Sequence, residues 1–153
     1  MLNRSDLDKI KKEVEDFFRK MTVDIEHDSL QQKEETVSVD IRVEEPQILI
    51  GEKGQTLLDI QHLLSVMLRK KIESKFFLDL DINDYKKKKM EYLKELARSV
   101  ADEVALARKE KILPVMSAYE RRIIHMELAG RGNVTTESIG EEPDRRLVIK
   151  PYP

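Results

Sequence analysis

The tetrapeptide Gly51-Glu52-Lys53-Gly54 follows the apolar run Ile48–Ile50. Glycine adopts backbone angles that other residues avoid, and because it has no Cβ a ligand can approach its backbone closely. A helix expected after Gly54 would direct its unpaired N–H groups and the positive end of its dipole to the same place. This chemistry suits phosphate, so the tetrapeptide is predicted to clamp the backbone of a nucleic acid strand. The alternative is a tight turn before a helix.

A second candidate pair, Arg121 and His125, is spaced four residues apart, so the two side chains would share one face of a helix. The planar fork of arginine suits phosphate oxygens, and histidine adds one or two donors. The alternatives are a half-buried histidine beside an ordinary surface arginine, or a histidine acting as an acid or base. A hydrolytic role lacks a nucleophile elbow, an H-E-x-x-H motif, a Walker lysine motif and a convincing carboxylate pair. No catalytic residue is therefore assigned.

Composition narrows the class of protein. The 153 residues are 40% hydrophobic and 38% charged, without an apolar run near the length of about 20 that spans a bilayer and without a basic and then apolar leader. These features predict a soluble protein. Zero cysteines exclude disulfides and thiolate zinc sites, and the three histidines are scattered. The sequence predicts a cytoplasmic protein with no metal and no cofactor.

Charge is unevenly distributed, although the net charge is only −2. Residues 1–50 carry 8 Lys and Arg against 13 Asp and Glu, whereas residues 51–153 carry 20 against 17. The basic excess of the second part suits a phosphate-bearing partner, and solvated helix ends are the alternative explanation. The acidic first part and only four Phe and four Tyr, most of them interpreted as buried, favour a protein-interaction adaptor instead.

Hydrophobic spacing predicts the elements around the tetrapeptide. Apolar residues three or four apart indicate helices, and alternation indicates strands. The predicted order is a helix over 5–20 capped by Ser5, a strand over 21–27, a turn over 28–35, a strand over 36–43, a short helix over 47–50, a helix from Gln55 to about Glu73, and a strand over 76–82.

This order of helix, strand, strand, short helix, G-x-x-G, helix and strand resembles a type II KH domain. The resemblance implies that Gly51, Glu52, Lys53 and Gly54 bind about four nucleotides through their backbone, with Ile50 and Leu57 beside an apolar groove. Glu52 departs from the family, which more often has a basic residue there. Phosphate affinity at this loop is therefore expected to depend on Lys53 and on backbone N–H groups.

The second half of the chain begins with a long helix, predicted from Tyr85 to about Lys109 and capped by Asn83 or Asp84. A capping box from Ser117 to Glu120 begins another helix, which carries Arg121 and His125. Gly130 and Gly132 end that helix. Strands over 134–138 and 145–150 are predicted to flank a turn at 140–143.

Arg-x-x-x-His, preceded by Ser-x-Tyr-Glu and followed by Gly-Glu-Glu-Pro-x-Arg-Arg, resembles the single-stranded nucleic-acid-binding domain named for that Arg and His. The resemblance implies that Arg121 and His125 contact nucleic acid, with Arg122, Arg145 and Arg146 nearby. Because Arg145 and Arg146 are adjacent, they would point to opposite faces of a strand, and only one is expected to reach the ligand.

A type II KH domain joined to this second domain resembles the Jag family of bacterial RNA-binding proteins. The resemblance implies an α+β chain with a KH-like domain over residues 1–83 and the Arg-x-x-x-His domain over 84–153. The expected partner is single-stranded RNA, with DNA, a protein partner and a homodimer as alternatives. Jag proteins commonly carry a further N-terminal domain, so the chain is expected to be a fragment or a short member.

Overall fold

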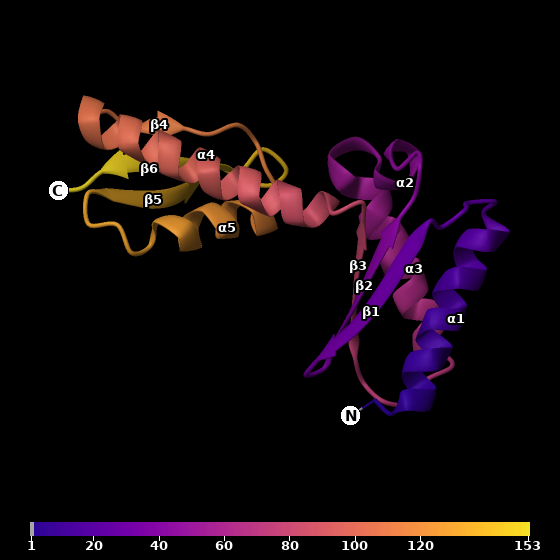
Figure 1. Cartoon of the computed structure of the whole chain (residues 1–153). Helices are drawn as coiled ribbons and strands as arrows, with labels where there is room; N and C mark the ends of the chain where they lie inside the picture. Colours follow the sequence, from indigo (N-terminus) through magenta and orange to yellow (C-terminus); the bar gives the residue numbers. More distant parts are fainter. Residues whose placement is uncertain (1) are drawn as a thin grey trace. The chain divides into compact units, whose positions relative to one another are not determined.

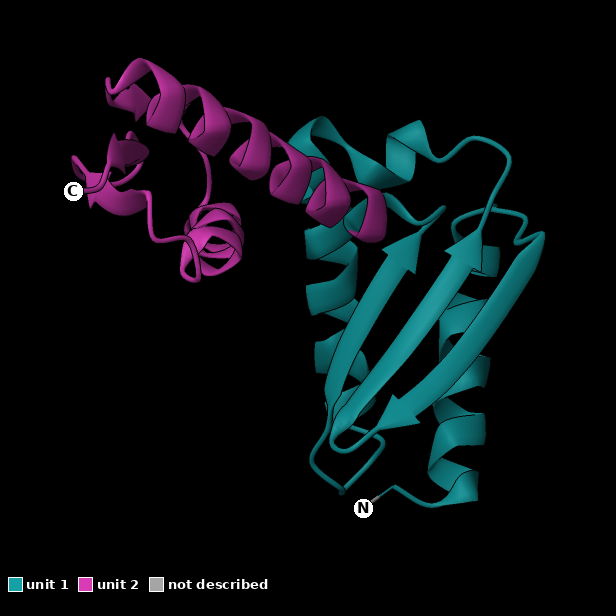
Figure 2. Cartoon of the chain, turned by 60° about the vertical axis from the view of Figure 1, so that its left-hand side comes forward, with its two compact units in different colours: residues 1–86 teal, residues 87–153 magenta. Residues whose placement is uncertain are grey.

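The computed structural model describes residues 2–153 and divides the chain into two compact units, residues 1–86 and residues 87–153 (Figure 2). Each unit has its own sheet and its own buried core. The predicted α+β class is confirmed. None of the helices within residues 2–153 combines the length and the apolar composition that a membrane span requires.

Unit 1 is a three-stranded sheet with helices on one face (Figures 1 and 2). The strands lie in the order β1-β2-β3, with β1 antiparallel and β3 parallel to the central β2. The elements along the chain are α1 (Arg4–Lys20), β1 (His27–Lys33), β2 (Thr36–Arg42), α2 (Gln47–Ile50), the single turn η1 (Glu52–Gly54), α3 (Gln55–Arg69) and β3 (Phe77–Ile82). The order that accompanied the KH resemblance is therefore present.

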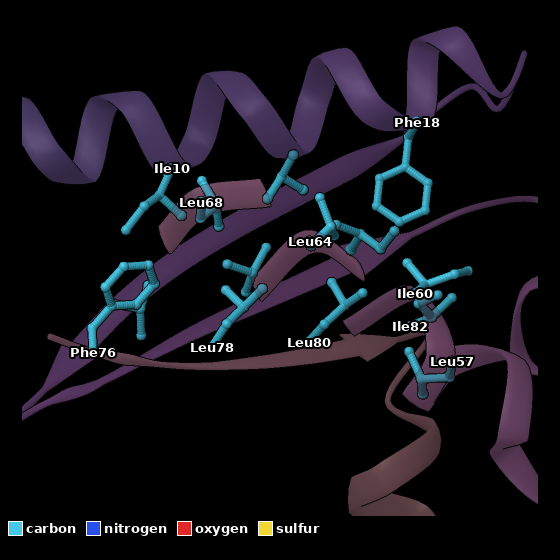
Figure 3. Close-up of a cluster of buried hydrophobic side chains, with 14 of the residues drawn as sticks. Ile10, Phe18, Leu57, Ile60, Leu64, Leu68, Phe76, Leu78, Leu80 and Ile82 are labelled. Carbon is cyan, nitrogen blue, oxygen red and sulfur yellow. The ribbon is translucent and has the colours of Figure 1, made fainter. Parts of the chain in front are cut away.

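The core of unit 1 lies between the two long helices and the sheet. Figure 3 shows Ile10 and Phe18 of α1 directed toward a layer that contains Leu64 of α3 and Leu80 of β3. All four of these side chains are fully buried. Alternate residues of β2 and β3 face the same core, as the sequence pattern predicted. This packing fixes where α3 begins, and hence the position of the tetrapeptide before it.

Two predictions for the start of unit 1 are wrong. The first strand spans His27–Lys33, where a turn was predicted, and the predicted strand over 21–27 is mostly a connecting segment. Val23 and Ile25 pack against the core from that segment, which explains their apolar character. The cap of α1 is Asn3 instead of Ser5, because Asn3 and Asp6 form a reciprocal capping box.

Unit 2 contains most of α4 (Tyr85–Ala107), then β4 (Lys111–Ile112), α5 (Ala118–Leu128), β5 (Val134–Ile139) and β6 (Arg146–Pro151). Its antiparallel sheet has the order β4-β6-β5. Buried side chains of α4, α5 and the sheet form its core, among them Ala97, Ile124 and Leu147. The short strand β4 was not predicted.

Two polar side chains just before α4 bond backbone groups in this region. A carboxylate oxygen of Asp81 accepts a hydrogen bond from the backbone N–H of Lys86 at 3.0 Å. The Asn83 side chain instead bonds the backbone of Val43, donating to the carbonyl and accepting from the N–H, both at 2.9 Å. Asp81, at the end of β3, therefore accepts a hydrogen bond from the first turn of α4, while the Asn83 side chain is used on Val43.

Candidate nucleic-acid interface

The G-x-x-G loop has a backbone that requires glycine at both ends. Gly51 has φ 71° and ψ −174°, and Gly54 has a left-handed φ of 80°. A Cβ on Gly51 would lie 2.1 Å from Oγ1 of Thr56, and one on Gly54 would lie 2.7 Å from the ring of Tyr85. The two glycines are therefore explained by conformation and packing, whether or not a ligand binds.

The same loop presents groups that suit an anion. Gly54 is the N-cap of α3 and provides no side-chain hydrogen bond to the first turn, so the positive end of the helix dipole faces the loop without a side-chain cap. Glu52 and Lys53 are both exposed, and Lys53 has the left-handed φ of 52°. Lys53 supplies the positive charge of the loop, while Glu52 opposes an approaching phosphate.

The apolar residues around the loop are not equally accessible. Leu57 is only 1% exposed and belongs to the core, and Ile50 is half-buried against that core. Ile48, by contrast, is 79% exposed on α2. The open apolar surface beside the loop is therefore provided by Ile48 rather than by Leu57.

In unit 2, most of the predicted site residues line a groove of about 370 Å³. It lies between α5 and the sheet, and four of the five predicted residues of this domain line it. The lining residues are Ala118, Arg121, Arg122, His125, Thr136, Ser138, Arg145 and Leu147. Arg146 pairs with Ile139 in the β-ladder and is not among the described residues that line the groove.

Arg121 lies at the back of this groove and is almost entirely engaged within the protein. Its side chain is 7% exposed. One terminal nitrogen donates to the carbonyls of Met116 at 2.7 Å and Arg145 at 3.3 Å, and the other forms an ion pair with Glu142. Arg121 thereby connects the start of α5 to the turn before β6, and it fixes the backbone of Arg145.

His125 is exposed, one helical turn beyond Arg121. Its Nδ1 lies 2.5 Å from Oγ1 of Thr136, a hydroxyl that can donate or accept. This contact orients the imidazole ring and leaves Nε2 as the nitrogen available to a ligand. Thr136 and Ser138 were not predicted as site residues, although their i, i+2 spacing in a strand places both on one face.

The basic side chains of unit 2 differ in whether an acid neutralises them. Lys150 pairs with Glu137, which raises the pKa of the lysine and lowers the pKa of the glutamate. Other cations are paired in the same way, namely Lys89, Arg98, Lys111 and Arg131. Within residues 2–153, Arg122 and Arg145 form no ion pair, so the groove keeps its positive charge.

The chain is similar to known proteins. Residues 91–151, which include α5 and the whole groove, match the R-3-H domain, the domain named for its Arg-x-x-x-His motif. The chain is 36% identical over 129 residues to RNA-binding protein KhpB of Clostridium symbiosum, covering 84% of this chain and 58% of the relative. It is 35% identical over 123 residues to KhpB of Bacillus subtilis, covering 79% and 59%.

A third relative, KhpB of Lactiplantibacillus plantarum, is 38% identical over 102 residues, covering 67% of this chain and 32% of the relative. The chain thus spans about a third to three fifths of the curated relatives that it matches.

Proposed function

Since the chain belongs to the Jag family, whose curated relatives are named RNA-binding protein KhpB, we propose that it binds single-stranded RNA and catalyses no reaction on it. The groove of unit 2 is the main site, and the G-x-x-G loop of unit 1 is a second, weaker one. Two linked sites raise the overall affinity through effective concentration. A cytoplasmic location stays a prediction from the cysteine-free composition.

The observation that carries this proposal is the pair of unneutralised arginines beside His125. Arg122 and Arg145 line one groove with the ring of His125 and the hydroxyls of Thr136 and Ser138. Arginine forks and hydroxyls together bind phosphate and sugar oxygens. Arg121 supports the wall of this groove, and direct contact between its guanidinium and RNA would require displacement of Glu142. Arg146, which is exposed outside the groove, adds long-range charge.

The G-x-x-G loop contributes backbone donors and one cation. Gly51 and Gly54 allow a strand to approach the start of α3, where the helix dipole, with no side-chain cap, favours phosphate. Glu52 weakens this attraction, so Lys53 supplies most of the favourable charge of the loop. We assign the loop a smaller share of the affinity than the groove.

Replacing Arg122 and Arg145 together by glutamine is expected to weaken binding of a short single-stranded RNA by roughly tenfold or more at 100 mM salt. Each phosphate contact on a single strand contributes about 0.7 to the slope of log K against log salt. The slope should therefore fall by roughly 1.4. Fluorescence polarisation between 50 and 300 mM salt measures both quantities.

The matched control is Lys109→Gln, which removes an exposed cation of unit 2 that does not line the groove. It should leave the affinity within about twofold and the slope nearly unchanged, since an exposed charge away from the strand is largely screened. An equal loss in both variants would mean that the charge of unit 2 acts non-specifically and that the groove is not the site.

Lys53→Gly separates binding by the loop from folding. Lys53 occupies the left-handed region, which costs a non-glycine residue of order 1 kcal/mol, and glycine removes this cost. The variant should be as stable as the parent chain or slightly more stable, yet bind RNA a few-fold more weakly with a slope lower by about 0.7. Urea unfolding followed by circular dichroism measures the stability, and fluorescence polarisation measures the RNA affinity and its salt slope.

Arg108→Gly is the control for Lys53→Gly, because Arg108 is also a cation with a positive φ, 56°. Arg108 lies in unit 2, after the end of α4 and outside the groove-lining set. Unchanged RNA affinity is expected for this variant. If Lys53→Gly also leaves affinity and slope unchanged, the loop makes no phosphate contact.

A further inference from the structure

Several aromatic side chains are exposed, contrary to the expectation that most of them are buried. Tyr119 is 65% exposed, and Phe77, Tyr92 and Tyr152 are exposed to a similar degree. Three of these four belong to unit 2, which also contains the groove. Aromatic rings are the platforms on which the bases of a single strand stack. The burial expected for the few aromatic residues, which favoured a protein-interaction adaptor, is therefore no longer an argument against nucleic acid binding.

Tyr119 lies beside the groove on α5. At 100° per residue, the groove-lining positions 118, 121, 122 and 125 form one side of this helix. Tyr119 and Met126 lie next to that side, with the exposed Arg122 between them in the same i, i+3, i+7 row. We call Tyr119, Arg122 and Met126 the α5 rim. Its two ends are about 10 Å apart along the helix axis.

The backbone under Tyr119 is held in place before any ligand arrives. Ser117 and Glu120 form a capping box, with hydrogen bonds of 2.8 and 3.2 Å between side chain and backbone. Glu120 also pairs with Lys89 of α4 at 3.3 Å, so the first turn of α5 is tied to the long helix. A base that stacks on this ring therefore has to order only the side chain of Tyr119 and not the backbone beneath it.

The cationic groove and the exposed ring suit the two parts of a nucleotide. Phosphate is attracted to Arg122, Arg145 and His125, and an unstacked base needs a flat apolar surface within one nucleotide of that phosphate. Arg122 is shared by the groove and the rim, so a strand held there places its bases over Tyr119 or Met126. A protein partner would not require this alternation of cation and ring.

We propose that Tyr119 is a base-stacking residue for single-stranded RNA and that Met126 contacts a neighbouring base, while the sugar-phosphate backbone lies in the groove. This inference rests on the proposed RNA binding and extends it. Contact through stacking is tolerant of sequence, because every base has a π-face. The α5 rim therefore binds unpaired bases with little sequence preference, and the paired bases of double-stranded RNA do not gain this contact.

The test compares Tyr119→Ala with Tyr119→Phe and Tyr152→Ala in the full chain. One stacked base lost costs roughly five- to 150-fold in affinity, and the salt slope should not change because no charge is removed. Phenylalanine keeps the ring and should retain nearly all of the affinity. Tyr152, 58% exposed just beyond β6, is a matched tyrosine outside the groove-lining set, so its removal should have no effect.

A short single-stranded RNA carrying 2-aminopurine gives a readout specific for stacking. Its fluorescence should change on binding to the parent chain and to Tyr119→Phe, but less on binding to Tyr119→Ala. If the parent chain binds RNA and Tyr119→Ala binds it equally well with the same fluorescence change, the stacking role is wrong. If the parent chain binds no RNA at all, the proposed function itself fails.

Discussion

Replacing Arg121 by methionine is expected to lower the free energy of unfolding of unit 2 by about 3–5 kcal/mol. The change leaves the carbonyls of Met116 and Arg145 without their charged donor and removes the partner of Glu142. Hydrogen bonds to charged groups are worth about 1.5–3 kcal/mol each, and a buried group left unpaired adds a desolvation cost. Because Glu142 is mostly exposed, the loss of its ion pair with Arg121 adds little to the loss of stability.

Urea unfolding of the full chain, with hydrogen exchange mapped to residues 117–147, measures this loss and locates it. Arg122→Met is the matched control, since it removes the same type of side chain from the next position of α5, where the residue is exposed. A surface change of that kind shifts stability by only about 0.5 kcal/mol. An Arg121 variant as stable as the control would show that the guanidinium contributes nothing to the fold.

The two variants should also differ in their effect on RNA binding. Arg122 carries a free charge into the groove, so its loss should lower the salt slope. Arg121 uses its donors on Met116, Arg145 and Glu142, so its loss should act through the position of Arg145. In this interpretation the arginine of the Arg-x-x-x-His motif organises the groove, and the neighbouring arginine supplies the contact.

Sequence periodicity predicted the elements that have a clear apolar face. The helix α3 and the strand β3 were predicted because their apolar residues recur at helical and alternating spacing and are buried. The strand β1 was missed because its sequence, HDSLQQK, contains one apolar residue. Its stability comes from the ladder with β2, a long-range pairing that local composition does not encode.

The candidate site was predicted as a set of residues but not as an arrangement. Motif spacing identified Arg121, His125 and the arginine pair, and three-dimensional packing decided which of them are accessible. The burial of Arg121 depends on a turn 21 residues away, so no local pattern could show it. Thr136 of β5 was not predicted, because only the structure shows that its hydroxyl contacts His125 of α5.

Gly51→Ala is expected to destabilise unit 1 by about 2–6 kcal/mol. The combination of φ 71° and ψ −174° lies in a region that is essentially restricted to glycine and costs other residues about 1–3 kcal/mol. The new Cβ would also lie 2.1 Å from Oγ1 and 3.0 Å from the backbone N of Thr56, so rotation of one side chain cannot relieve the overlap. Overpacking of this kind typically adds a further 1–3 kcal/mol or so.

Gly130→Ala provides the comparison, because a Cβ there meets no atom within 4 Å and the residue has no positive φ. It should leave stability unchanged or raise it slightly through the unfolded state. Unfolding monitored by circular dichroism, with hydrogen exchange mapped to residues 47–69, separates the two variants. Equal stability of the Gly51 and Gly130 variants would contradict the strained loop conformation.

The expected cost at Gly51 also decides how the loop should be probed. A bulky or charged residue at either glycine would abolish RNA binding by disturbing the start of α3, even if the loop never touched RNA. Gly54→Ala has the same difficulty, because its φ is 80° and its Cβ would lie 2.7 Å from the ring of Tyr85. Lys53→Gly removes the charge and relieves strain at once, so a loss of binding in a stable Lys53→Gly chain, together with unchanged binding by Arg108→Gly, is attributed to the charge of the loop and not to disturbance of α3.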